Sequence, residues 1–258
     1  MEWVLGTFCF CGHDFHVYHF DVPSESGGAA AEINVASLRD QVDVHAAQLD
    51  QAAEEIGAVL WTESTAGCLR WLEEQVVFST SERRGHKPLD GRRILELGAG
   101  CGVVGVALTC AGADVTVTDI ASVVPLLQVN AQLQRKEGRS IAVRTLNWSE
   151  AIPPDLTSDF DYVIGCDLIY DLTDLEGLLK VLQFFVVGDC EFHLAVNMRD
   201  EGAGLERFVA MLEPDFIVSC NPAPADTKGE TKGDELSHCN GVEILTARRR
   251  SALQSLAS

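Results

Sequence analysis

The chain has 258 residues, of which 47% are hydrophobic and 22% are charged, so it has enough apolar side chains for a substantial globular core. Its 19 basic and 39 acidic side chains give a formal net charge of −20 at pH 7. A surface this acidic repels the phosphates of a nucleic acid and suits a basic protein or peptide. Nucleic acid is therefore not expected as a partner.

The nine cysteines are odd in number and scattered, several of them within apolar stretches. A secreted domain held together by disulfides more often has an even set in a short chain. The sequence opens with no basic segment followed by an apolar one, and no stretch approaches the roughly 20 apolar residues that cross a bilayer. We therefore expect reduced, buried thiols, a cytoplasmic location and no membrane partner.

The N-terminal region begins with a predicted β-hairpin. Apolar residues alternate over residues 8–11 and 15–20, on either side of Gly12. Residues 23–32 are small and polar and predict a linker. Residues 34–56 fit either a helix or a short strand, so their structure stays open.

The main domain is expected over residues 57–258, after an extension of hairpin and linker over residues 1–56. Between residues 88 and 220, short β-branched runs alternate with longer amphipathic ones, which is the pattern of βαβ units. Ser122 is expected to cap one of the helices. The expected strands are 93–97, 114–118, 141–146, 162–166, 191–196, 216–220 and 242–246. The expected helices are 62–77, 103–110, 122–136, 174–185 and 204–212.

A glycine turn is the strongest chemical feature of the sequence. In the string RRILELGAGCGVVGVAL, Gly98, Gly100 and Gly102 follow a strand and precede an apolar helix, and they let the backbone approach a ligand closely. About twenty residues later, Asp119 ends the next strand, where its carboxylate can accept hydrogen bonds from two ribose hydroxyls. The two features together predict an adenosine-type cofactor.

The identity of that cofactor depends on where the turn begins. Gly100, Gly102 and Gly105 satisfy the GxGxxG fingerprint of dinucleotide-binding proteins, but the turn starts earlier, at Gly98, and Glu96 stands just before it. A carboxylate suits the methionine ammonium of S-adenosylmethionine and would repel a diphosphate. The string ELGAGCG therefore fits the (E/D)xGxGxG motif of S-adenosylmethionine methyltransferases.

A second group of residues follows the apolar strand YVIGC. Asp167 comes directly after it and Tyr170 three residues later, so both are expected at the cofactor edge of the sheet. This D-x-x-Y arrangement, preceded by the glycine motif, resembles the (D/E)xx(Y/F) hallmark of the seven-strand protein lysine methyltransferases of methyltransferase-like family 16.

Two further segments are similar to that family. Trp61 resembles the tryptophan that leads the helix before the glycine motif and contributes to the cofactor pocket. Asn147 and Trp148 resemble the segment that flanks the adenine. The resemblance extends over about residues 40–248, and its four ordered motifs are more specific together than any one alone.

The resemblance implies a fold, an activity and a set of site residues. The fold is α/β, a Rossmann-like seven-strand sheet that is mostly parallel with an antiparallel last strand, with helices on both faces and an N-terminal β-hairpin extension. The activity is transfer of a methyl group from S-adenosylmethionine to a lysine of a protein substrate, presented in a basic segment. The implied catalytic residues are Asp167 and Tyr170, and the implied cofactor-binding residues are Trp61, Glu96, Gly98, Ala99, Gly100, Gly102, Asp119, Asn147, Trp148 and Cys166.

The chain departs from the family in two regions. The linker at 23–32 lengthens the N-terminal part, and the polar loop expected at 221–238 is longer than the usual hairpin. Such regions shape the substrate entrance, so the identity of the substrate protein stays open.

Structural roles compete with these assignments. Trp61 and Trp148 can be packing aromatics, Tyr170 can start a helix, and Asp167 can cap one. Cys101 stands beside the glycines, but no histidine lies at a spacing that suggests covalent catalysis, so packing is preferred for it.

One N-terminal cluster has the composition of a metal site. Zinc sites normally bring two ligand pairs together across a longer loop, whereas these residues lie on one short hairpin and alternate in facing. We therefore expect no metal. The cluster comprises Cys9, Cys11, His13, His16 and His19.

Three other functions stay open. A protein that binds S-adenosylmethionine without catalysis would differ in a methylation assay. A methyltransferase for small molecules or nucleic acids is a second alternative, although the (N/D)PP(Y/F) motif typical of base methylation is absent where DLIY stands. A dinucleotide oxidoreductase is the third, and it would bind NAD in place of S-adenosylmethionine.

Overall fold

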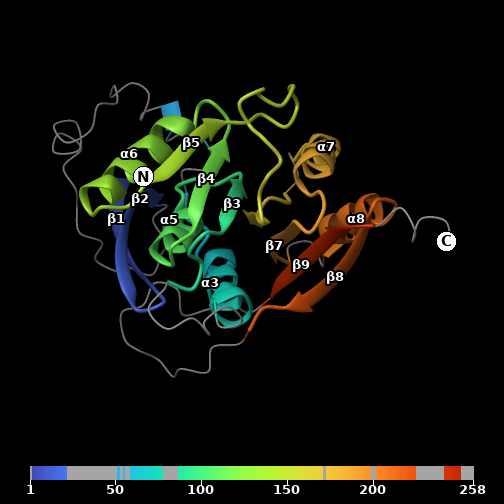
Figure 1. Ribbon diagram of the computed structural model, residues 1–258, viewed down its shortest axis with the longest axis horizontal. Coiled ribbons are helices and arrows are strands. Elements are labelled where there is room, and N and C mark those ends of the chain that lie inside the picture. The colour runs from blue at the N-terminus through green and yellow to red at the C-terminus, as the bar shows by residue number, and fades with distance from the viewer. Residues whose placement is uncertain are drawn as a thin grey trace.

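The computed structural model describes residues 2–21, 51–52, 55, 59–77, 87–170, 173–198, 202–224 and 241–250. Seven strands form one sheet: β3 (Arg93–Leu97), β4 (Asp114–Asp119), β5 (Ile141–Thr145), β6 (Tyr162–Cys166), β7 (Glu191–Asn197), β8 (Phe216–Pro222) and β9 (Val242–Arg249). Their spatial order is β5-β4-β3-β6-β7-β9-β8 (Figure 1). The first five pair in parallel, while β9 is antiparallel to both of its neighbours. The predicted α/β sheet with an antiparallel last strand is confirmed.

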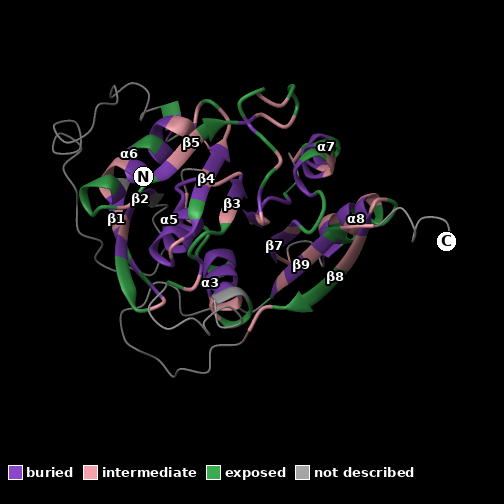
Figure 2. Ribbon diagram, in the orientation of Figure 1, coloured by how far each residue is buried: buried purple, intermediate pink, exposed green. Residues whose placement is uncertain are grey.

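Helices cover both faces of the sheet, as expected. They are α3 (Thr62–Trp71), α5 (Val103–Cys110), α6 (Val124–Lys136), α7 (Leu175–Phe185) and α8 (Ala203–Leu212), with a π-helix over Leu72–Val77 that continues α3. One cluster of buried side chains joins the sheet to α3, α5 and α6, and a second joins its other face to α7 and α8. Figure 2 shows buried residues running through β3, β4 and α5 at the centre of the fold.

Several strands are longer than their apolar patterns indicate. β8 continues to Pro222 and β9 to Arg249, because the backbone pairing persists from Phe216 opposite Arg249 to Pro222 opposite Glu243. Ladder hydrogen bonds need no apolar side chain. The first two residues of the loop expected at 221–238 therefore belong to β8. The part of that loop beyond residue 224 lies outside the described residues. So do most of residues 23–56 and the domain boundary expected at residue 56.

Ser122 does not cap α6, so that expectation is wrong. Val123 occupies the cap position, and no side chain caps the helix. The amide of Val124 instead donates to the carbonyl of Ile120 at 3.2 Å, so a backbone turn satisfies the donor that the hydroxyl was expected to serve.

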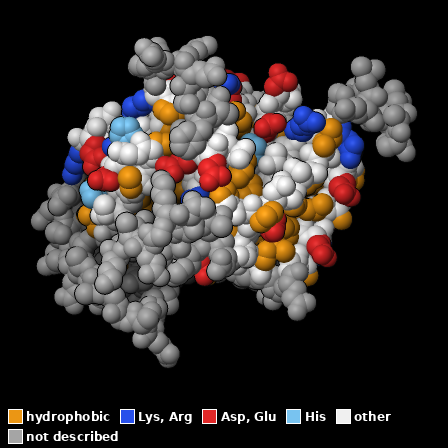
Figure 3. Space-filling model, turned by 90° about the horizontal axis from the view of Figure 1, so that it is seen from below, with side chains coloured by type: hydrophobic (Ala, Val, Ile, Leu, Met, Phe, Trp, Pro, Cys, Tyr) orange, Lys and Arg blue, Asp and Glu red, His pale blue; other side chains and the backbone are white. Residues whose placement is uncertain are grey.

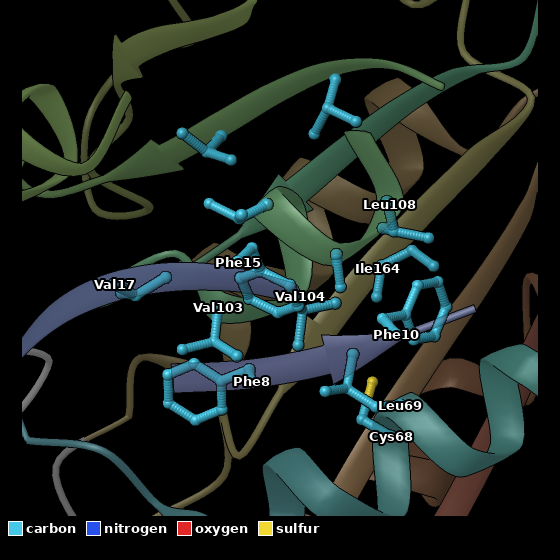
Figure 4. Packing of buried hydrophobic residues seen from close by; sticks show 14 of the residues in the cluster. Phe8, Phe10, Phe15, Val17, Cys68, Leu69, Val103, Val104, Leu108 and Ile164 are labelled. Atoms are coloured by element: carbon cyan, nitrogen blue, oxygen red, sulfur yellow. The ribbon is translucent and has the colours of Figure 1, made fainter. Parts of the chain in front are cut away.

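The predicted hairpin is present and forms a sheet of its own. β1 (Glu2–Phe10) pairs with β2 (His13–Asp21) across a turn in which Cys11 and Gly12 both have positive φ, as a tight two-residue turn requires. Its inner face carries Phe8, Phe10 and Phe15, which pack onto α5 (Figure 4). At the turn, the Cys11 amide donates to Glu73 Oε1 at 2.6 Å.

The cysteines are free, but not all of them are buried. Each of the eight within the described residues is a free thiol. Cys9 and Cys220 are exposed, because the hairpin and the end of β8 each turn one face to solvent. Within the described residues, no group of three or more His, Cys, Asp and Glu side chains is placed to hold a metal ion. Nor does that part of the chain contain a helix with the length and hydropathy to cross a membrane.

A buried histidine gives the fold a defined acid sensitivity. His193 on β7 packs against the Trp71 ring at 4.5 Å, and its Nδ1 lies 3.1 Å from Thr246 Oγ1. Burial lowers the pKa of His193 to about 4, even though Glu191 Oε2 lies 3.6 Å from Nε2. The unfolded chain therefore takes up this proton first as the pH falls.

We predict that, at acidic pH, the free energy of unfolding depends less on pH in His193→Gln than in the unmodified chain. Because the pKa is lower in the folded state, stability is lost as the pH falls from about 6.5 to about 4, by up to about 3 kcal/mol. Urea unfolding at several pH values measures the loss, which is expected to be smaller in the variant. His13→Gln, at an exposed hairpin position, is the control and should keep the original slope. An unchanged slope in His193→Gln would contradict the assignment.

Candidate active site

A cavity of about 250 Å³ opens at the carboxyl ends of β3, β4 and β6. The strand order runs to β4 on one side of β3 and to β6 on the other, which is where ligands bind in doubly wound sheets. All of the predicted site residues line this cavity except Gly102. The lining residues are Glu55, Val59, Leu60, Trp61, Thr65, Glu96, Gly98, Ala99, Gly100, Cys101, Val103, Val104, Asp119, Ile120, Val123, Leu146, Asn147, Trp148, Ser149, Cys166, Asp167, Leu168, Tyr170, Thr173 and Asp174.

The glycine turn forms one wall of the cavity. Gly98 has a φ of +55°, and a Cβ there would lie 2.6 Å from Leu168 Cδ2 and 3.4 Å from the Trp148 ring. The Ala99 amide donates to the carbonyl of Thr118 at 3.0 Å, which fixes the turn to β4. Only glycine allows both this backbone conformation and this approach.

Gly102 is placed differently from the prediction. It has a φ of +81° at the start of α5, and a Cβ there would lie 2.9 Å from Leu127 of α6. Its role is to turn the chain into the helix. Gly105, the last glycine of the GxGxxG match, faces Val117, where a Cβ would come within 2.4 Å. Close packing of helix on strand therefore accounts for Gly105.

Asp119 connects the end of β4 to the glycine turn. Its carboxylate accepts hydrogen bonds from the amides of Gly100 at 2.7 Å and Ile120 at 2.8 Å. Burial raises the pKa of Asp119 to about 6, against the lowering effect of these two donors. Each oxygen keeps capacity for a further donor, such as a ribose hydroxyl.

Glu96 is the most deeply buried carboxyl group of the cavity. It is 2% exposed, and its Oε2 has no hydrogen-bond partner. Burial raises the pKa of Glu96 to about 8, against the lowering effect of the Gly105 amide, and the charge of Asp119 adds to the rise. The Oε2 atom lies beside Gly105 of α5, where a Cβ would come within 2.5 Å of it. An ammonium group in the cavity would offset the remaining cost of burying this carboxyl group.

Every charged side chain in the described lining is acidic. It contains five carboxylic acids and no Lys, Arg or His. Such a lining favours a ligand with a sulfonium and an ammonium group, and it disfavours the diphosphate of a dinucleotide. The glycine cradle and this charge together fit S-adenosylmethionine. The five acids are Glu55, Glu96, Asp119, Asp167 and Asp174.

The segment after β5 reaches the cavity through Asn147 and Trp148, as predicted. The Trp148 ring lies beside Gly98. The side-chain amide of Asn147, by contrast, forms hydrogen bonds within its own turn. Its Nδ2 donates to Glu150 Oε1 at 2.9 Å, and its Oδ1 accepts from the Ser149 amide at 3.1 Å. The Asn147 side chain thus holds the turn that presents Trp148.

Helix α3 closes another side of the cavity. Trp61 precedes its first residue and is 40% exposed, so it lies at the rim. Thr65 Oγ1 lies 3.9 Å from Cys166 Sγ at the end of β6. A hydrogen bond with Cys68 and burial raise the pKa of Cys166 well above its ordinary value. Cys166 is therefore a packed thiol and no nucleophile.

Asp167 begins an unusual turn at the end of β6. Its φ is +58°, a left-handed conformation that few residues other than glycine adopt, and its amide donates to the Ala195 carbonyl at 2.7 Å. The side chain is 7% exposed. Asp174, not Asp167, caps α7, by accepting from the Gly177 amide at 2.8 Å. The capping alternative for Asp167 is thereby removed.

Tyr170 completes the turn at the mouth of the cavity. It is 39% exposed, and its amide donates to Thr173 Oγ1 at 3.0 Å. The same hydroxyl donates to the Leu168 carbonyl at 2.7 Å, so Thr173 holds the turn closed. Burial raises the pKa of Tyr170, and the charge of Asp119 raises it further, so the phenol stays protonated.

Sequence reasoning missed part of the lining. Ile120 directly follows Asp119, and Asp174 starts a predicted helix, so both could have been proposed from their positions. Thr173 had no motif to mark it. Glu55 belongs to the segment whose structure was left open, and nothing in its pattern indicated a place in the cavity.

Comparison with known proteins gives consistent results. A family described as lysine methyltransferase matches residues 39–215. The protein N-lysine methyltransferase METTL21A of Danio rerio is 29% identical over 194 residues, which cover 74% of this chain and 83% of that protein. The EEF1A lysine methyltransferase 3 of Xenopus tropicalis is 29% identical over 132 residues, which cover 50% of this chain and 57% of that protein.

A solved structure shares the fold. The 16S rRNA N2 G1207 methyltransferase of T. thermophilus, in complex with AdoMet and guanosine, gives a TM-score of 0.50 at 15% identity. The match covers 97% of this chain and 51% of that one. At this identity, the likeness concerns the fold alone.

We predict that Gly98→Ala weakens cofactor binding more than it weakens the fold. The new methyl group would meet Leu168 at the wall of the cavity. Gly188→Ala is the matched control, because Gly188 has a similar φ of +60° with open space around it. Both variants should lose about 1 kcal/mol of stability from the left-handed backbone, and Gly98→Ala should lose somewhat more because of the contact with Leu168. Calorimetry should show at least tenfold weaker S-adenosylmethionine binding in Gly98→Ala only. Equal affinities would refute the role of the turn.

Proposed function

This chain belongs to the lysine methyltransferase family, and we propose that the cavity at β3, β4 and β6 is where it binds its cofactor and receives its lysine. S-adenosylmethionine is the methyl donor, and a protein lysine is the acceptor. The family assignment sets aside the dinucleotide oxidoreductase.

The cofactor is assigned to the residues of the glycine wall. Gly98, Ala99 and Gly100 provide close backbone contact, and Asp119 accepts from the ribose hydroxyls. Glu96 pairs with the methionine ammonium, which its place in the acidic lining of the cavity supports. Trp148 and Asn147 flank the adenine, while Trp61 and Cys166 complete the pocket from the side of α3.

The chemistry needs alignment more than activation. When bound, S-adenosylmethionine supplies a sulfonium methyl with a good leaving group, so no nucleophilic side chain is required. The lysine amine must be neutral and in line with that methyl group. Asp167 accepts a hydrogen bond from the amine and holds the proton that the amine loses. Tyr170 provides an aromatic wall for the entering lysine.

One observation carries this assignment. Asp167 is a nearly buried carboxylate held in a left-handed turn at the end of β6, beside the acidic cavity. Backbone strain of this kind costs about 1–3 kcal/mol and is concentrated at functional sites. Thr173 and the Ala195 carbonyl fix the turn from two sides, so the carboxylate is positioned before a substrate arrives.

We predict that Asp167→Asn abolishes methyl transfer with little change in cofactor affinity. Asn tolerates the left-handed backbone, so the variant removes the charge and keeps the turn. Activity, measured with tritiated S-adenosylmethionine and a cell lysate, should fall by at least about 100-fold. Cofactor affinity should stay within about tenfold, or roughly 1.4 kcal/mol. Asp189→Asn, at an exposed position after α7, is the control. Normal turnover in Asp167→Asn would refute the assignment.

The substrate is assigned as a protein that presents its lysine in a basic segment. A groove of about 440 Å³ runs along α8, and among its described lining residues three are glutamates and none is basic. Helix α8 itself packs against the turn that holds Asp167, because a Cβ on Gly204 would lie 3.1 Å from Ile169 Cγ2. The lining residues are Met198, Gly202, Leu205, Glu206, Val209, Ala210, Glu213, Cys220 and Glu243.

The surface charge supports the same substrate class. The chain has a formal net charge of −20, and acidic side chains lie among the hydrophobic ones right of centre in Figure 3. A field of this sign raises the association rate of a positively charged partner and is screened by salt.

We predict that methylation of a basic acceptor slows as ionic strength rises. The initial labelling rate of the main acceptor band in a lysate should fall several-fold between about 0.05 and 0.5 M salt, because the Debye length shortens. A Glu206→Gln, Glu243→Gln double variant should reduce this dependence. Asp114→Asn is the control, because it removes a charge at the opposite edge of the sheet. A rate indifferent to salt would count against a basic segment.

The proposed location is the cytoplasm. Every cysteine within the described residues is a free thiol, including the exposed Cys9 and Cys220. Free surface thiols persist in reducing compartments. Cell fractionation tests this location directly.

A further inference from the structure

One buried side chain connects the N-terminal hairpin to the glycine turn. Asn130 lies on α6 and is 1% exposed. Its Oδ1 accepts from the Tyr18 amide at 2.8 Å, and its Nδ2 donates to the Tyr18 carbonyl at 2.9 Å. The same Nδ2 donates to the Cys101 carbonyl at 2.8 Å. Asn130 thus bonds two segments that are more than eighty residues apart in the sequence.

The contact with Cys101 bears on the cavity. Cys101 lines it and lies between Gly100 and Gly102, whose φ values are +56° and +81°. The peptide between Cys101 and Gly102 is held at both of its polar groups: the Gly102 amide donates to the Ala99 carbonyl at 2.7 Å, and the Cys101 carbonyl accepts from Asn130. Asn130 is the only one of these two partners that lies outside the turn, so it ties the turn to α6 without a ligand.

The hairpin supports the same wall through packing. Figure 4 shows Phe8 and Phe15 beside Val103 and Val104 at the start of α5, and all four belong to one buried cluster. Val103 and Val104 line the cavity. The hairpin therefore packs behind the first turn of α5, while Asn130 holds Cys101, two residues before that turn.

We propose that Asn130 is a positioning residue for S-adenosylmethionine, and that it couples the N-terminal hairpin to the cofactor site by holding the Cys101 carbonyl. The inference rests on the glycine wall being the cofactor site. It extends that site to residues 2–21, which contain none of the residues assigned to the cofactor or the lysine.

The chemistry of the position explains why an amide is required. Two carbonyl oxygens face Nδ2, and one amide faces Oδ1, so the group must donate and accept at once. A carboxylate of the same shape would place negative charge against both carbonyls. An alanine would leave the Tyr18 amide and two carbonyls without their side-chain partner, which is costly inside a protein.

The chain offers a matched control one turn along α6. Gln134 is also buried, and its Nε2 donates to the His16 carbonyl of the same hairpin at 2.9 Å. No hydrogen bond connects it to the glycine turn within the described residues. Gln134→Leu therefore loosens the hairpin while leaving the Cys101 contact in place.

The test compares cofactor binding in Asn130→Asp, Asn130→Ala and Gln134→Leu with that of the unmodified chain. Calorimetry measures S-adenosylmethionine affinity, and circular dichroism shows that each variant is folded. We expect the affinity to fall at least tenfold in both Asn130 variants and less than threefold in Gln134→Leu. In methylation assays, the loss should lie in KM for the cofactor rather than in kcat.

The outcomes separate this inference from the cofactor assignment. Folded Asn130 variants with affinity within threefold of the unmodified chain would overturn it, and so would an equal loss in Gln134→Leu, which would indicate general loosening. If Asn130→Asp does not fold, Asn130→Ala decides. Weak binding in Gly98→Ala with normal binding in the Asn130 variants refutes the coupling only, whereas normal binding in Gly98→Ala refutes the glycine wall itself.

Discussion

Two carboxylic acids beside one glycine turn, Glu96 buried and Asp119 partly buried, are the constraint on which the site depends. Glu96 and Asp119 lie at the ends of neighbouring strands, and burial raises the pKa of each. Removing charge from water is costly unless a cation or hydrogen-bond donors compensate. The Gly100 and Ile120 amides compensate Asp119, whereas the Gly105 amide offsets only part of the effect of burial on Glu96. This imbalance suits the cavity to a cationic cofactor.

The residues proposed to receive the lysine are also held in a fixed orientation by the chain itself. Asp167 is held in a left-handed turn before any lysine arrives, and Thr173 closes that turn with two hydrogen bonds. A group that is already oriented loses little conformational entropy when the substrate binds, because that entropy was lost when the protein folded. Cofactor and acceptor thus share a cavity with one sign of charge, which suits a reaction between a sulfonium and a lysine.

Sequence reasoning succeeded where local pattern and chemistry agree and failed where packing decides. The glycine turn, Asp119 and Asp167, which all line the cavity, follow from short motifs, and the seven-strand sheet follows from the family resemblance. Gly102 does not line the cavity, and its φ of +81° turns the chain into α5. Ser122 was expected to cap a helix, but a backbone turn satisfies the donor. That error concerns a competing hydrogen-bond acceptor, which a sequence does not show.

By itself, the sequence determined the class of the protein and the motif residues of its cavity lining, because residues at the ends of parallel strands meet at one edge of the sheet. Only the tertiary structure showed that Glu55 joins this lining and that the hairpin adjoins it through Asn130. An asparagine on a helix is usually a surface residue, and nothing in its neighbours indicates two partners so far away. Long-range hydrogen bonds depend on how helices and strands pack against one another, and the residues next to Asn130 in the sequence do not indicate that packing.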